Sequence, residues 1–250
     1  MFRIYDLYEG NLQHFADMVH VQKIGLDCME DIEHVEVLSQ FVHLKELNMH
    51  LSGRSDYSFV NRLSPGLKVL SLYADFSQEN ITFWDTSLYE MEWLLRFPDL
   101  QSFYIGNPAQ HIEFLIRKDS VRELILYEMP CPSLEVLRML DVQSVIIHQE
   151  HVQGLERLEH MDSLQEIQLV KIADINRLDF LENMPALQKV TLHSLPELTS
   201  LPHFPEGQKL LELAVYDCEK LTDMSTINEV VKQWFVRQYS VGAESAAGAY

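Results

Sequence analysis

Nine copies of a short apolar pattern are spaced regularly along this sequence. Each copy has an apolar residue, two variable residues, an apolar residue, one variable residue and a third apolar residue. Successive copies start 23, 23, 33, 21, 21, 22, 23 and 23 residues apart, so one repeat is longer and none is lost. Such spacing indicates a repeat protein whose units stack on one another. The copies begin at Val21, Leu44, Leu67, Leu100, Val121, Val142, Leu164, Leu187 and Leu210.

Each copy is predicted to be a short strand. Side chains alternate across a strand, so the apolar positions point into a core and the variable positions between them face outward from a parallel sheet. One repeat cannot bury its apolar side alone, whereas stacked repeats bury a continuous core. The intervening segments, such as IEHVEVLSQF and GLERLEHM, place apolar residues three and four positions apart. This spacing predicts helices behind the sheet.

Over residues 21–224 the repeats resemble the leucine-rich repeat superfamily, in an irregular form with units of mostly 21–23 residues. The resemblance implies an α/β solenoid, a horseshoe with a parallel concave sheet and helices on the convex side. Many members carry Asn or Cys at the ninth position of the repeat, and here only Cys218 matches. A regular ladder of asparagines is therefore not expected.

The sequence predicts four regions: an N-terminal cap over 1–20, nine repeats over 21–224 with a long repeat at 67–99, a capping helix over 225–239 and a disordered tail over 240–250. The opening MFRIYDL is expected to add an edge strand. The helix is predicted from the capping-box spacing of Thr226 and Glu229, followed by apolar residues. The tail VGAESAAGAY has too few large apolar residues to pack.

Composition narrows the classes of partner. Nineteen basic and thirty-eight acidic residues give a formal net charge of −19, which opposes binding to nucleic acid or to an anionic membrane surface. The first residues do not read as a secretory signal, and no apolar run of about 18 residues suggests a membrane span. Three widely separated cysteines are typical of reduced thiols. We therefore expect a cytoplasmic protein.

One outward-facing column is rich in rings. The residue after the third apolar position is His or Tyr in six of nine copies. Neighbouring strands lie about 4.8 Å apart, so these rings should form a ridge along the concave face. Because tyrosines concentrate at interface hot spots, the ridge is a candidate partner-binding surface. The alternative is that the rings only cover the sheet. The six residues are His50, Tyr73, Tyr127, His148, His193 and Tyr216.

Two further candidate partner-binding segments follow strands in the N-terminal half. The first is acidic and contains Asp27, Glu30, Asp31 and Glu33. The second is the loop over 74–86 in the long repeat, whose aromatic residues are Phe76, Phe83 and Trp84. Exposed aromatic loops are frequent binding sites. The alternative is that Phe83 and Trp84 fold back to cover a helix edge.

A uniformly acidic concave face is not predicted. The variable strand positions carry six basic and seven acidic residues, so nearly all of the net charge lies in helices and loops.

No catalytic, metal or cofactor site is predicted. His148 and His151 lack further ligands at zinc-binding spacing, and the sequence has no phosphate-binding loop, dinucleotide motif or serine elbow. Cys28 precedes an acidic run, which should raise the pKa of its thiol and disfavour a nucleophilic role.

The leading hypothesis is a non-catalytic module that binds another protein through the His and Tyr ridge and the acidic, aromatic edge. Two alternatives stay open. The chain is an acidic inhibitor or immunity-type protein that neutralises a basic toxin or nuclease, or it is a substrate-recognition or scaffold subunit of a larger assembly such as a ligase adaptor.

Overall fold

The computed structural model describes most of the repeat region and parts of both ends. The described residues are 2–5, 11–28, 32–51, 58–73, 92–106, 117, 119–127, 134–205, 208, 210–223 and 233–237.

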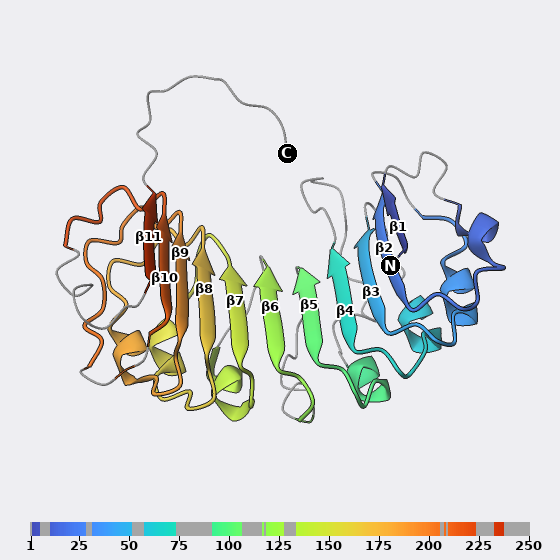
Figure 1. Ribbon diagram of the computed structural model, residues 1–250, viewed down its shortest axis with the longest axis horizontal. Helices are drawn as coiled ribbons and strands as arrows, with labels where there is room; N and C mark the ends of the chain where they lie inside the picture. Colours follow the sequence, from blue (N-terminus) through green and yellow to red (C-terminus); the bar gives the residue numbers. More distant parts are fainter. Residues whose placement is uncertain are drawn as a thin grey trace, which may run out of the picture.

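These residues form one parallel sheet of eleven strands whose spatial order follows the chain order from β1 to β11 (Figure 1). Together with the turns behind it, the sheet makes an open horseshoe solenoid. The nine predicted strands are present as β2–β10, and one strand is added at each end. The strands are β1 Phe2–Tyr5, β2 Lys23–Cys28, β3 Glu46–Leu51, β4 Val69–Tyr73, β5 Ser102–Gly106, β6 Glu123–Tyr127, β7 Ser144–His148, β8 Glu166–Val170, β9 Lys189–His193, β10 Glu212–Tyr216 and β11 Gln233–Arg237.

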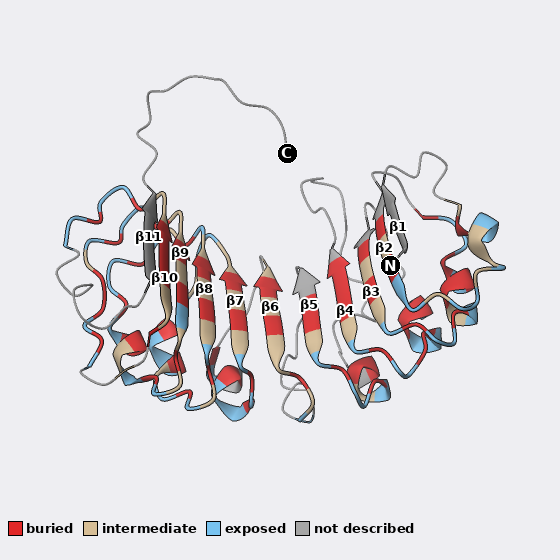
Figure 2. Ribbon diagram, viewed as in Figure 1, coloured by how far each residue is buried: buried red, intermediate tan, exposed pale blue. Residues whose placement is uncertain are grey.

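The strand register confirms the predicted repeat pattern. The fourth residue of each copy faces the fourth residue of the next, as in the pairs Leu124↔Val145 and Val145↔Ile167. Leu124 and Leu126 of β6 are buried, while the residues between and beside them are half-buried. Figure 2 shows this buried row crossing the strands. Each fully buried Leu or Val contributes about 1.5–3 kcal/mol relative to an exposed side chain, so the stacked rows are the main source of stability.

The long repeat leaves the sheet undisturbed. Val69 of β4 is in register with Ser102 of β5, and three further pairs continue this alignment along the two strands. The extra residues therefore lie outside the strand pairing. Residues 74–91, which include most of the insertion, lie outside the described part of the chain.

The predicted convex helices are short 3₁₀ turns in the described residues. A 3₁₀ turn places residues three apart on the same side, so Leu155 and Leu158 both reach the core from one turn. It also rises about 2.0 Å per residue, against about 1.5 Å for an α-helix, and so crosses the back of a short repeat with fewer residues. The turns are η1 Leu12–Phe15, η2 Val35–Gln40, η3 Ser58–Arg62, η4 Glu92–Arg96, η6 Leu134–Met139, η7 Leu155–Leu158 and η8 Asp179–Asn183.

Of the predictions for the two ends of the sheet, one is confirmed and one is wrong. The predicted N-terminal edge strand is confirmed as β1, which pairs with β2. The predicted C-terminal helix over 225–239 is wrong at Gln233–Arg237, which forms β11 and pairs in register with β10. Pairing satisfies the backbone groups that β10 would otherwise leave open, and aromatic and β-branched residues favour a strand. The rest of 225–250 lies outside the described residues.

Candidate functional site

The concave face is built from the outward-facing third, fifth and seventh positions of the repeats. The strand register aligns the seventh positions as predicted: Asp27 faces His50, His50 faces Tyr73, and Tyr127 faces His148. The side chains of Asp27, His50 and Tyr73 lie outside the described part of the structure. The geometry of the ridge is therefore known from Tyr127 onward.

In this part, the ridge consists of two pairs of rings. The rings of Tyr127 and His148 meet edge to face, with centroids 4.4 Å apart at 80°. The rings of His193 and Tyr216 make a similar contact at 5.8 Å and 74°. Val170 lies between the pairs in the register, so the predicted ridge is interrupted by an aliphatic residue.

The first ring pair belongs to a larger apolar surface. Tyr104, Ile125 and Ile146 occupy the fifth position in β5, β6 and β7 and face one another in register. The ring of Tyr104 is buried and lies 6.1 Å from that of Tyr127, and both isoleucines are half-buried. We call Tyr104, Ile125, Ile146, Tyr127 and His148 the central patch. It extends across three neighbouring strands near the middle of the sheet.

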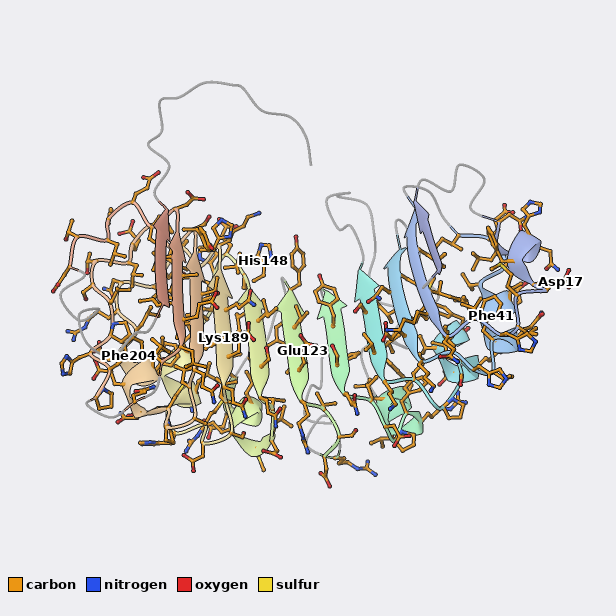
Figure 3. The ribbon with its side chains drawn as sticks, viewed as in Figure 1. Asp17, Phe41, Glu123, His148, Lys189 and Phe204 are labelled. Carbon is orange, nitrogen blue, oxygen red and sulfur yellow. The ribbon has the colours of Figure 1, made fainter. Side chains whose placement is uncertain are left out.

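Polar residues border the central patch. In the fifth-position row, Ser71 precedes Tyr104 and Gln168 follows Ile146. In the third-position row, Glu123, Ser144 and Glu166 lie in register at the start of their strands. Figure 3 shows Glu123 toward the start of β6 and His148 at the opposite end of β7. The patch is thus a limited apolar area on a polar face.

The fifth-position row was not predicted from the sequence, because the prediction of a ridge followed only the seventh position. A signal was present: the fifth residues of three consecutive copies are Tyr104, Ile125 and Ile146, whereas those of the other six copies are small or polar. Large apolar residues at an outward position of three adjacent strands predict an exposed apolar patch.

A groove lies beyond the ends of β7–β10, next to the central patch. Its volume is about 580 Å³, and its lining residues are His148, Glu150, Lys171, Ala173, Ser194, Pro196, Asp217 and Glu219. His148 belongs to both the groove and the patch. We call this feature the strand-exit groove.

The backbone at the groove repeats one unusual conformation. Lys171, Ser194 and Asp217 follow the last residues of β8, β9 and β10 and have φ angles of 56°, 55° and 52°. This left-handed conformation is uncommon outside glycine. Backbone hydrogen bonds hold it in place, since Lys171 N donates to His193 O at 2.8 Å and Ser194 N donates to Tyr216 O at 2.9 Å.

Several ionisable groups near the groove have nearby partners. His193 Nε2 lies 3.3 Å from Asp217 Oδ2, and Lys220 Nζ lies 2.6 Å from Glu197 Oε2. His151 Nδ1 lies 2.7 Å from Asp174 Oδ2, and this hydrogen bond raises the pKa of the fully exposed imidazole above its usual value. No salt bridge to Glu150 or Glu219 forms within the described part of the chain. Both carboxylates are exposed, and the charge of Glu150 also contributes to the raised pKa of His151.

The N-terminal candidates have a mixed outcome. Glu33 is exposed, and its backbone forms a parallel bridge with Asn11. Glu30 and Asp31 lie outside the described residues, as do Phe76, Phe83 and Trp84 of the long repeat. A role of these segments in binding stays a prediction.

Cys218 is the ninth-position residue that matches the family pattern. It is a buried free thiol that donates from Sγ to Tyr216 O at 3.4 Å. Burial raises the pKa of this thiol, which suits a packing role better than a nucleophilic one. Among the described residues, no three His, Cys, Asp or Glu side chains gather as a metal site.

Comparison with known proteins identifies the fold. No family model and no curated protein matches the sequence. Solved structures do match. An internalin from Listeria monocytogenes is 15% identical in sequence, and the match covers 95% of this chain and 72% of the internalin with a TM-score of 0.48. Toll in the Drosophila Toll–Spatzle complex is 14% identical, and the match covers 91% of this chain and 34% of that chain with a TM-score of 0.54. A plant peptide hormone receptor in complex with RGF2 matches at 12%, covering 89% and 42% with a TM-score of 0.45.

The chain is a leucine-rich repeat solenoid. The Toll match and the parallel sheet with repeats of 21–23 residues agree on this fold. The chain spans less than half of the Toll and plant receptor chains. Within the described residues, no helix has the length and apolar character needed to cross a membrane.

Proposed function

We propose that this chain is a non-catalytic module that binds another protein through its concave face, with the central patch as the main contact. One observation carries the proposal: Ile125, Ile146 and Tyr127, beside the buried ring of Tyr104, form a half-buried apolar surface on the face of the sheet opposite the core. Core packing already uses Leu124 and Leu126 on the other side of the same strand. The accessible parts of Ile125, Ile146 and Tyr127 are therefore available for a second contact.

The composition of the central patch and its ordered rings support this surface as the anchor. Interface hot spots are enriched in Tyr and lie in apolar areas bordered by polar groups. The central patch has this composition, with Glu123 and Gln168 near its border. The edge-to-face contact between Tyr127 and His148 holds the rings in place before binding, which lowers the conformational entropy lost in a complex. The fold neighbour Toll was solved in a complex with Spatzle, which is consistent with a binding role for such a solenoid.

The test is affinity capture from a lysate of the source organism with three forms of the chain. The first is unchanged, the second carries Tyr127→Ala and Ile146→Ser, and the third carries Asn48→Ala and Thr191→Ala on the same face, away from the patch and its border. We expect a specific protein to be captured by the first and third forms and reduced at least tenfold with the second. Equal recovery by all three forms would exclude the central patch as the anchor, provided circular dichroism shows that all are folded.

A second candidate function is neutralisation of a basic protein, as an inhibitor or immunity-type protein. The formal net charge of −19 and the excess of carboxylates over lysine in the strand-exit groove favour it. Electrostatically steered association weakens as ionic strength rises. If this function is right, the association rate of the captured partner falls steeply between about 50 and 300 mM salt, a range over which the Debye length shortens to below about 10 Å. A rate that does not change with salt would contradict it.

The cytoplasmic location, the absence of nucleic acid and membrane partners, and the role of the 74–86 loop stay predictions from the sequence.

A further inference from the structure

We infer that the central patch and the strand-exit groove form one docking surface for an extended segment of the partner that carries an apolar residue and, about five positions away, an arginine or lysine. This inference rests on the proposed function and names the chemistry of the partner. The two features share His148, so a single segment can contact both without leaving the protein surface.

Small side chains create the groove. Behind the left-handed residues Lys171 and Ser194, the chain places Ala173 and Pro196, which leave space between the larger side chains of the neighbouring repeats. The space of about 580 Å³ is large enough for a long side chain. The equal conformation of successive repeats makes the groove run across the strand ends.

The net negative charge of the groove favours a positively charged side chain. The groove carries Glu150, Asp217 and Glu219 against Lys171, which leaves an excess of two negative charges. Adjacent acids outside it are already paired, since Asp174 contacts His151 and Glu197 contacts Lys220. Glu150 and Glu219 are exposed and form no salt bridge within the described part of the chain. An arriving guanidinium or ammonium group would therefore meet exposed carboxylates that outnumber the lysine of the groove.

The central patch complements this with an apolar contact. Ile125, Ile146 and the ring of Tyr127 offer a surface on which a Phe, Leu or Trp side chain can pack. Glu123 and Glu166 border the same patch at the start of their strands, so an acidic segment would be repelled at both borders. Charge complementarity thus favours a basic and apolar segment over an acidic one.

The spacing follows from sheet geometry. The middle of the groove is separated from β6 by two to three strands, or about 12 Å across the sheet. Along the strand direction the separation is about three residues, or about 10 Å. The diagonal is about 16 Å, and an extended peptide advances about 3.3 Å per residue. The basic residue should therefore lie about five positions from the apolar anchor.

The test uses synthetic hexapeptides titrated into the full chain, with binding followed by amide chemical shifts in ¹H–¹⁵N spectra. The first peptide has phenylalanine first, arginine last and four serine or threonine residues between them. The second replaces arginine by citrulline, which keeps the shape and removes the charge. The third places arginine directly after phenylalanine. We expect the first peptide to shift the amides of Ala173 and Ser194 and to bind at least fivefold more tightly than the other two.

Protein variants assign the effect to the groove. Glu150→Gln with Glu219→Gln should weaken the arginine peptide at least fivefold and leave the citrulline peptide unchanged, whereas Lys171→Gln should strengthen the arginine peptide. A matched control, Glu156→Gln with Asp162→Asn, removes the same charge from exposed positions outside the groove. It should weaken the arginine peptide by less than twofold.

Three results would overturn the inference: no binding of the arginine peptide up to millimolar concentration, equal binding of the citrulline peptide, or equal weakening by the groove and control variants. They leave the proposed function standing as long as the Tyr127→Ala and Ile146→Ser form loses its captured protein. If that form keeps the protein, the proposed function fails, whatever the peptides do.

Discussion

Leu124 shows how much of the stability depends on single core side chains. It has no exposed surface and faces Phe103 and Val145 in the two neighbouring strands. Leu124→Ala should lower the free energy of unfolding by about 2–5 kcal/mol, because it removes apolar contacts and leaves a cavity between rigid strands. Urea unfolding followed by circular dichroism measures this. Glu156→Ala, at an exposed position, is the control and should change stability by less than about 0.5 kcal/mol.

His151 offers a prediction on protonation. Its hydrogen bond to Asp174 raises the pKa of the imidazole above the unfolded value, so the pair adds stability at pH values below the unfolded pKa. This contribution is lost as pH rises through the higher, folded pKa. Histidine-selective NMR titration should show a raised pKa for His151 and its return toward the ordinary value in Asp174→Asn. An unchanged pKa in that variant would show that Asp174 is not the cause.

At the residue scale, two of the five residues of the central patch were predicted from the sequence. Tyr127 and His148 were predicted because the seventh position repeats rings across several copies. Tyr104, Ile125 and Ile146 were missed because each looks like an ordinary strand residue when its own copy is read alone. Their significance comes from three adjacent strands placing them side by side, a property of neighbouring copies compared position by position.

The left-handed backbone conformation at the strand ends can be tested by substitution. Ser194 has a φ of 55° between Lys171 and Asp217, its equivalents in the adjacent repeats. Ser194→Val should lower the free energy of unfolding by about 1–3 kcal/mol, because a β-branched residue is strongly disfavoured in the left-handed region. Ser194→Gly, which tolerates this region, should cost much less. Thermal and urea unfolding of both variants compare the two costs, and a valine variant as stable as the glycine variant would contradict the assignment.

At the scale of whole elements, the strands of the repeats were predicted correctly, whereas the convex segments and β11 were not. The strands followed from apolar spacing, because alternation is a local property that each copy displays in six residues. The convex segments were predicted as helices but form 3₁₀ turns. Apolar residues three and four positions apart do not distinguish a single turn of α-helix from a single 3₁₀ turn. β11 was predicted as a helix because the edge of β10 that pairs with Gln233–Arg237 is known only from the assembled sheet.

For the whole molecule, the net charge should affect stability. A formal charge of −19 spread over loops and turns repels itself, and salt screens this repulsion. We expect the melting temperature to rise between about 10 and 150 mM NaCl, because the few exposed ion pairs that salt also screens are worth little. The charge-reduced form with Glu156→Gln and Asp162→Asn should show a smaller rise. A falling melting temperature would mean that attractive pairs dominate.

Because spatial order repeats chain order, from β1 to β11, the concave face also behaves as a linear scale. Moving a contact by one strand, about 4.8 Å, requires a change 21–23 positions away in most of the sequence. An inserted or deleted residue in one turn is therefore absorbed within its own repeat, as the longer unit between β4 and β5 shows. One repeat can therefore gain or lose residues, or change its outward side chains, while the strands of all the other repeats keep their positions.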